Sequence, residues 1–164
     1  MLINLIAPVL GVVGLAIAFF IYQKILASPT GEGKVAEIAD AIHLGAMVFM
    51  RREYSILVPF ALIVAALLFF SDLGWKTALS FLVGAFCSGT AGYLGMFSAT
   101  KANVRTTMAA HKQGAAAALS LAFYGGSVMG LCVASLGLLG LGTLYYFFGG
   151  SPESAHAIHG FGMG

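Results

Sequence analysis

Charged residues are scarce in this chain. Its 164 residues include only eight Lys and Arg and six Asp and Glu, so that 9% are charged while 60% are hydrophobic. Soluble globular domains carry about 25% charged residues and are about 45–50% apolar. So few charges could not cover a surface exposed to water, and the mean hydropathy is +0.96. The composition excludes a small soluble domain and predicts an all-α protein that crosses a lipid bilayer several times. We expect no nucleic-acid partner.

The four longest apolar runs contain no Asp, Glu, Lys or Arg, and no charge occurs between Lys112 and Glu153. Self-contained transporters and proton pumps normally keep an ionisable group at membrane depth, where it binds the ion or substrate. We therefore interpret the four runs as scaffold. A path lined by backbone carbonyls or by the Ser88 and Thr90 hydroxyls stays open as an alternative.

Cysteine is rare too, and a basic leader is missing. Cys87 and Cys132 both lie inside apolar runs, which favours packing over a disulfide framework. No basic residue precedes the first apolar run, whereas Lys24 follows it. This order favours a retained transmembrane helix over a signal peptide.

The apolar runs and the breakers between them predict a polytopic membrane protein with four transmembrane helices and the start of a fifth. We expect one membrane domain over residues 1–164, with helices at about 2–22, 34–70, 75–110, 114–148 and 155–164. The second helix is amphipathic as far as Glu53. At roughly 55 Å it exceeds a hydrocarbon core of about 30 Å, so its first half must stand in water or against protein. Because the chain stops inside the fifth helix, we expect an N-terminal fragment of a larger protein.

Small residues recur at every fourth position of the third and fourth helices, and such rows let membrane helices approach closely. The third helix has Gly84, Ser88 and Gly92 in one row. The row in the fourth helix predicts a packing face and comprises Ala118, Ala122, Gly126, Gly130 and Ala134.

The basic residues indicate an orientation. With four spans, Lys76 falls on one side and the other seven basic residues fall on the opposite side. By the positive-inside rule, the N-terminus is outside and the connections at 23–53 and 100–113 face the cytoplasm. The seven are Lys24, Lys34, Arg51, Arg52, Lys101, Arg105 and Lys112.

Two basic clusters could carry chemistry. Lys101 and Arg105 share a helix face, which suits either a phosphate contact or a membrane anchor that pairs with Glu37, Asp40 or Glu53. A second cluster comprises Arg51, Arg52 and Glu53. We interpret it as a charged collar, for anchoring or for an ion pair between helices.

The other candidates are weaker. His156 and His159 are three residues apart and could be half of a metal site, but no third ligand lies nearby. We expect His43 and His111 to be solvated. The glycines at the end of the chain imitate a phosphate loop, but no strand precedes them and no helix with a Lys follows, so a nucleotide site is rejected. These glycines are Gly160, Gly162 and Gly164.

Several segments together resemble the membrane-bound inorganic pyrophosphatases, which are pyrophosphate-energised H+ or Na+ pumps. The most specific segment, residues 84–110, contains GAFCSGTAGYLGM and SATKANVRTTMAA. Residues 38–57 (IADAIHLGAMVFMRREYSIL) resemble the entry to the second helix of this family. Residues 122–130 (AFYGGSVMG) resemble its fourth helix, and residues 159–164 (HGFGMG) resemble the approach to its fifth.

The resemblance implies the N-terminal scaffold portion of a homodimeric pump in the cell (inner) membrane. The whole pump would hydrolyse pyrophosphate with Mg2+, in some members with K+, and export H+ or Na+. The Asp-rich catalytic loops of the family follow the start of its fifth helix. No residue here matches a catalytic, cofactor-binding or metal-binding position, so this chain alone is expected to be inactive. Only Glu32, Glu37, Asp40 and Glu53 are acidic residues on the expected cytoplasmic side.

The alternative is a stand-alone four-helix membrane transporter or an assembly partner without catalytic activity. Small transporters rely on a carboxylate within the membrane, and none of the four spans has one. A purely structural partner, which binds other helices through its small-residue faces, remains open.

Overall fold

The computed structural model of this protein describes residues 5–149 and 152–164, with side chains described for all of them except residues 152–157. The described residues form helices and contain no strand, which confirms the predicted all-α class. The helices are α1 (Ile6–Leu26), α2 (Lys34–Phe70), α3 (Gly74–Gln113), α4 (Ala115–Phe148) and α5 (Pro152–Met163). Within the described part of the chain, α1 to α4 are each long and apolar enough to cross a membrane.

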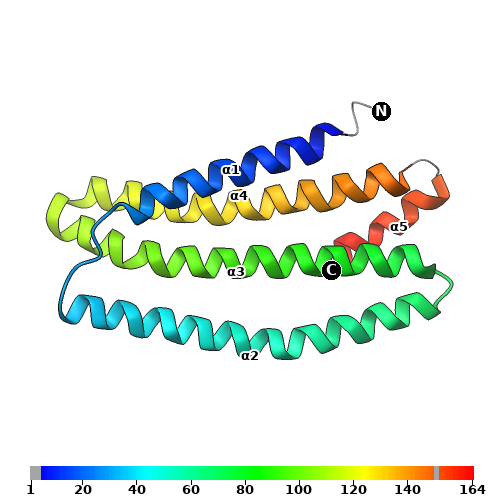
Figure 1. The fold of residues 1–164 in the computed structure, drawn as a ribbon, viewed down its shortest axis with the longest axis horizontal. Helices are drawn as coiled ribbons and strands as arrows, with labels where there is room; N and C mark the ends of the chain where they lie inside the picture. Colours follow the sequence, from blue (N-terminus) through cyan, green and yellow to red (C-terminus); the bar gives the residue numbers. More distant parts are fainter. Residues whose placement is uncertain (1–4, 150–151) are drawn as a thin grey trace.

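The long helices lie side by side in the order α1, α4, α3, α2, and the short α5 rests against α3 and α4 (Figure 1). Because α3 contacts each of the other four helices, it is the centre of the assembly. By contrast, α2 contacts α3 alone among the described helices. The segment with the most specific family resemblance is thus part of the helix that holds the others together.

The first helix ends later than expected, and its described part begins at Ile6. It continues through Gln23 and Lys24 to Leu26, and Ala27 then donates a backbone hydrogen bond to the Gln23 carbonyl. No breaker occurs before Ser28 and Pro29, and the polarity of two residues is not enough to end a helix. Residues 2–4 of the predicted helix lie outside the described residues.

The second helix runs unbroken over the expected range, with Pro59 inside it. It is bowed, with its middle away from α3 (Figure 1). A proline inside a helix removes one backbone hydrogen bond and commonly bends the helix.

The connection between α3 and α4 is very short, because Gly114 alone joins them. Its φ of +88° is a conformation that glycine adopts without strain.

Glycines let α1 lie close to α4. A Cβ added at Gly11 would be 2.7 Å from the Ser135 carbonyl oxygen, and one added at Gly142 would be 2.7 Å from the Pro8 ring. A small buried core lies further along α1 and comprises Ala18, Ile25, Ala102, Val128 and Cys132. Both cysteines are free, as their positions in apolar runs indicated.

The fifth helix also lies close to α3, because Gly160 faces the α3 backbone and Gly84 of α3 faces α5. A Cβ on Gly160 would collide with the Thr77 carbonyl, and one on Gly84 would collide with the Phe161 carbonyl. Of the glycines that imitate a phosphate loop, Gly160 and Gly164 therefore pack against α3, whereas a Cβ added at Gly162 would meet nothing within 4 Å. The helix begins at Pro152, three residues before the predicted start.

Most of the predicted small-residue face of α4 is left uncovered by the described residues. Ala122, Gly126, Gly130 and Ala134 are all exposed, and a Cβ added at Gly126 or Gly130 would meet nothing within 4 Å. The buried side of α4 instead carries Gly125, Val128, Cys132, Ser135, Gly140, Gly142 and Leu144. The spacing identified a row of small residues but could not show which of the α4 faces the neighbouring helices cover.

Candidate functional site: the projecting end of the bundle

Three helices reach well beyond the thickness of a membrane at the end opposite Trp75. A hydrocarbon core of about 30 Å takes about 20 residues of helix. Trp75 and Phe148 are in edge contact, with ring centroids 5.9 Å apart, so they mark one level. A count of about 20 residues along α3 from Trp75 reaches Gly95, and the same count back along α4 from Phe148 reaches Val128. Gly95 lies beside Met129, so the two counts end at the same level.

The same count on α2, made back from Phe70, reaches Met50, immediately before the charged collar of Arg51, Arg52 and Glu53. We call residues 34–50, 96–113 and 115–127 the projecting end. It includes the pair Lys101 and Arg105, His43 and His111, and the Glu37 and Asp40 carboxylates. Most of the candidate functional residues identified in the sequence therefore lie in the projecting end.

Arg105 is buried, with 7% of its surface exposed, and it ties α3 to the end of α1. Its Nε donates to the Ser28 carbonyl at 3.2 Å, and its Nη1 donates to the Lys101 carbonyl at 2.8 Å. Nη2 lies 3.5 Å from the Leu26 carbonyl. The guanidinium therefore reaches carbonyls at and just beyond the C-terminus of α1, where helix carbonyls lack an intrahelical partner.

This arrangement corrects one expected role of Arg105, the pairing with an acidic side chain. The hydrogen bonds described above go to backbone carbonyls and not to Glu37, Asp40 or Glu53. Lys101 is half-buried on the same face. Lys24 joins α1 to α4, because its Nζ donates to the Tyr124 hydroxyl at 3.1 Å and lies 4.6 Å from the centre of that ring.

Two polar contacts hold α2 to α3. His43 Nδ1 lies 2.8 Å from the Thr100 hydroxyl, and the His43 ring meets the edge of Phe97. The Tyr54 hydroxyl donates to the Gly89 carbonyl at 2.5 Å. His43 was expected to be solvated, and that expectation is wrong, whereas His111 is exposed. The spacing of α2 gave no sign of the His43 contact, because Thr100 lies 57 residues further along the chain.

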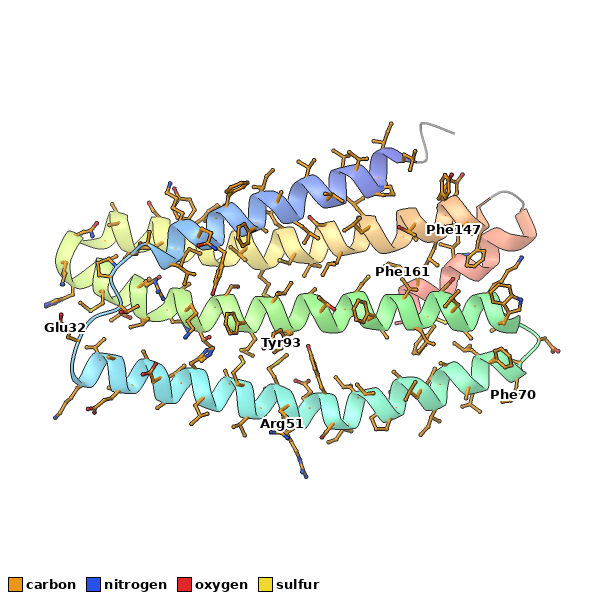
Figure 2. All side chains as sticks on the ribbon, in the orientation of Figure 1. Glu32, Arg51, Phe70, Tyr93, Phe147 and Phe161 are labelled. Carbon is orange, nitrogen blue, oxygen red and sulfur yellow. The ribbon has the colours of Figure 1, made fainter. Side chains whose placement is uncertain are left out.

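The collar residues Arg51, Arg52 and Glu53 are exposed. Figure 2 shows the Arg51 side chain pointing away from α3. The collar is thus on the outer face of α2, at the level where a hydrocarbon core would end. Anchoring at that boundary remains its interpretation.

The described acidic side chains do not form a metal site. Glu32, Glu37, Asp40, Glu53 and Asp72 are all exposed. In the described part of the chain, no three His, Cys, Asp or Glu residues gather closely enough to hold a metal ion. His156 lies outside the described side chains, so its predicted pairing with His159 stays a prediction. The described residues do not fit a Mg2+ centre.

Two hollows open on the outer side of α3 and α4 at the projecting end. One, of about 340 Å³, is lined by Asn103 and Thr107 of α3 and by Ala122, Gly125 and Gly126 of α4, among others. The other, of about 470 Å³, lies between Leu119, Ala122, Phe123, Gly126 and Ser127. Sequence reasoning missed both. The row of small residues on α4 was the signal that could have revealed them.

The fold and the projecting end define a class: a helical membrane protein of several spans, in which the buried polar groups described above join one helix to another. Within that class, the chain belongs to the family described as inorganic H+ pyrophosphatase, which matches residues 12–164. This confirms the resemblance found in the sequence.

Individual relatives agree with the family. The chain is 41% identical over 162 residues to the K(+)-insensitive pyrophosphate-energized proton pump 2 of Moorella thermoacetica, covering 97% of this chain and 24% of the relative. It is 42% identical to a proton pump of Methanosarcina mazei with nearly the same name, covering 96% and 23%. It is 38% identical to the K(+)-stimulated pyrophosphate-energized sodium pump of Thermotoga maritima, covering 84% and 19%. The chain therefore spans about a quarter or less of the length of these relatives.

Proposed function

We propose that this chain is the N-terminal scaffold portion of an ion-translocating membrane pyrophosphatase. The observation that carries the proposal is the use of the polar side chains in the bundle. Arg105, His43 and Tyr54 bond to other helices of the chain, while the five described acidic side chains stand apart on the surface. This arrangement supports a bracing role better than a catalytic one.

The whole pump would hydrolyse pyrophosphate and couple the reaction to export of H+ or Na+. The names of the relatives include both proton and sodium pumps, and both K(+)-insensitive and K(+)-stimulated ones. Mg2+ would be held by residues outside this segment, since the described carboxylates do not converge. The pump would be a homodimer in the cell membrane. The N-terminus of this chain would be outside, and its projecting end would be in the cytoplasm.

The test is a phosphate-release assay on the purified 164-residue chain in lipid vesicles. With Mg2+ and pyrophosphate present, we expect no phosphate release above that of empty vesicles. Release that depends on both Mg2+ and the chain would overturn the scaffold assignment, because it would require a catalytic centre within these residues.

The alternative of an independent transporter is less well supported. The described acidic residue nearest the expected membrane level is Glu53, which lies on the outer face of α2 and not between helices. An ion current across vesicles that contain this chain alone would favour that alternative over the scaffold.

A further inference from the structure

Arg51 and Arg52 have no carboxylate within reach on their own helix, although both side chains are exposed. Side chains three or four residues apart meet on the surface of a helix, whereas adjacent ones do not face each other. The residues at these spacings from the pair are uncharged and comprise Met47, Val48, Phe49, Tyr54, Ser55 and Ile56. Glu53 is adjacent in sequence, but the helix places it about 200° around α2 from Arg51 and about 100° from Arg52.

The other described helices do not supply the missing negative charge either. Within the described residues, α2 contacts α3 alone. The side of α2 that meets α3 carries the buried Met50 and the Tyr54 hydroxyl, which bonds to Gly89. Arg52 is two residues from each of them and therefore about 200° around the helix. Arg51 also points away from α3 (Figure 2). The two guanidinium groups therefore need an anion from outside the described part of this chain.

The pair lies at the level of the lipid phosphates. Met50, which precedes it, is about 20 residues from Phe70 and so marks the end of a hydrocarbon core of about 30 Å. Other basic side chains at this end are engaged within the bundle, since Lys24 donates to Tyr124 and Arg105 donates to backbone carbonyls. The planar fork of an arginine matches the geometry of a phosphate group. A phosphate at this level thus meets two arginines that have no other anion.

An exposed apolar row leads from the pair into the membrane. Ile56, Phe60, Ile63 and Leu67 are 61–67% exposed and recur every three or four residues, so they lie along one side of α2. The row begins one turn from Arg52. It is about 17 Å long, and half of a hydrocarbon core is about 15 Å thick. The row therefore matches the length of one acyl chain.

From these observations we infer that Arg51 and Arg52 bind the phosphate of an anionic phospholipid whose acyl chain lies along the row from Ile56 to Leu67. In a zwitterionic lipid the phosphate is already paired with the ammonium group of the same headgroup, whereas an anionic headgroup brings a net negative charge. The proposed topology places this end at the cytoplasmic leaflet, whose negative surface attracts basic segments beside a membrane span. The inference goes beyond the proposed function, because it needs only that the four long helices cross a bilayer.

The test reads lipid binding beside the pair by fluorescence. Trp75→Phe removes the single native tryptophan, and Ile56→Trp places a new fluorophore one turn from Arg52. The chain is reconstituted in phosphatidylcholine vesicles that contain a rising share of brominated phosphatidylglycerol or, in a second series, of brominated phosphatidylcholine. Because bromine quenches tryptophan on contact, the quenching compares the two affinities. We expect phosphatidylglycerol to bind several-fold more tightly at this position, and equal affinities would overturn the inference.

Two double substitutions show whether the arginines cause the preference. Arg51→Gln with Arg52→Gln should make the affinities for the two lipids equal. Lys34→Gln with Lys112→Gln removes the same charge from exposed positions beyond the membrane boundary and should leave the preference unchanged. If the arginine variant keeps the preference, or if both variants lose it alike, the pair is not the binding site.

A tryptophan on another helix separates local binding from a general attraction to the chain. Val12→Trp, used in place of Ile56→Trp, reports on the outer face of α1, where Val12 is 58% exposed and far from Lys24. We expect no preference for phosphatidylglycerol at this position. An equal preference at both positions would overturn the inference, because the net charge of the chain would then explain it.

Two measurements test other occupants of this face of α2. With Cys87 and Cys132 replaced by Ala, a disulfide between two copies that carry Ser55→Cys would make a second copy the occupant and overturn the inference. The second measurement uses a chimera in which this chain replaces the matched 162 residues of the Moorella pump.

Mass spectrometry of the intact chimera with its lipids counts the bound phosphatidylglycerol. We expect Arg51→Gln with Arg52→Gln to retain fewer of these lipids than the parent chimera. Equal numbers would mean that another segment of the pump covers the pair, and the inference would be wrong. None of these measurements uses pyrophosphate hydrolysis, so their failure leaves the proposed function standing.

Discussion

Arg105 illustrates what a buried charge does in this bundle. Its guanidinium lies between α3 and the end of α1, and it donates to the Ser28 and Lys101 carbonyls, with the Leu26 carbonyl at 3.5 Å. An arginine suits this position because its planar fork can reach several acceptors at once. The sequence showed that Arg105 is basic and near a membrane boundary, but its acceptors Ser28 and Leu26 lie 77 and 79 residues earlier in the chain and could not be identified.

We expect Arg105→Ala to lower the free energy of unfolding by about 1–3 kcal/mol, because part-buried carbonyls lose their donor. Arg105→Lys should give a smaller loss, since the charge stays but the fork is gone. Lys112→Ala, at an exposed position, is the control and should change little. Denaturant unfolding in detergent measures all three. Equal stability of Arg105→Ala and Lys112→Ala would show that Arg105 does not brace α1.

At the level of whole helices, the contact between α1 and α4 depends on glycine. A Cβ at Gly11 would be 2.7 Å from both the Ser135 carbonyl oxygen and the Leu139 side chain. Because one of these atoms is backbone, α1 and α4 would have to move apart. The approach is set by tertiary structure, and the small-residue rows identified in the sequence did not indicate it, because they include neither Gly11 nor Gly142.

Gly11→Ala should therefore destabilise the chain by about 1–3 kcal/mol, the usual cost of overpacking. Gly45→Ala is the matched control, because Gly45 lies in α2 with open space around it. The control should be neutral or slightly stabilising, since alanine favours helix over glycine. Thermal unfolding in detergent compares them, and a Gly11→Ala variant as stable as the control would contradict the close contact.

The helices themselves could largely be predicted from the sequence, for physical reasons. Long apolar runs are helical because backbone groups in lipid must be satisfied internally. Breakers such as Pro29 and Gly114 mark the connections between helices. It was harder to predict which face of each helix is buried. In α4, Gly125 is buried and Gly126 is exposed, and nothing in the local spacing distinguishes the two. Contacts across long stretches of chain, such as His43 with Thr100, had no local signal at all.

At the scale of the molecule, seven of the eight basic residues lie on one side of the four predicted spans. The positive-inside rule then predicts a cytoplasmic location for the projecting end. With the native cysteines replaced by Ala, Asp72→Cys should react with a membrane-impermeant maleimide on intact cells. Glu32→Cys should react only after permeabilisation. Both residues are exposed in connections between helices, and the reverse pattern would invert the proposed topology.

The central claim is that this chain braces the catalytic part of a pyrophosphate-energised pump. The most direct measurement is Mg2+-dependent phosphate release from pyrophosphate by the chimera that carries this chain in place of the matched segment of the Moorella pump. We expect hydrolysis by the chimera and none by the 164-residue chain alone. A chimera that inserts in the membrane and purifies as a folded protein, yet releases no phosphate, would contradict it.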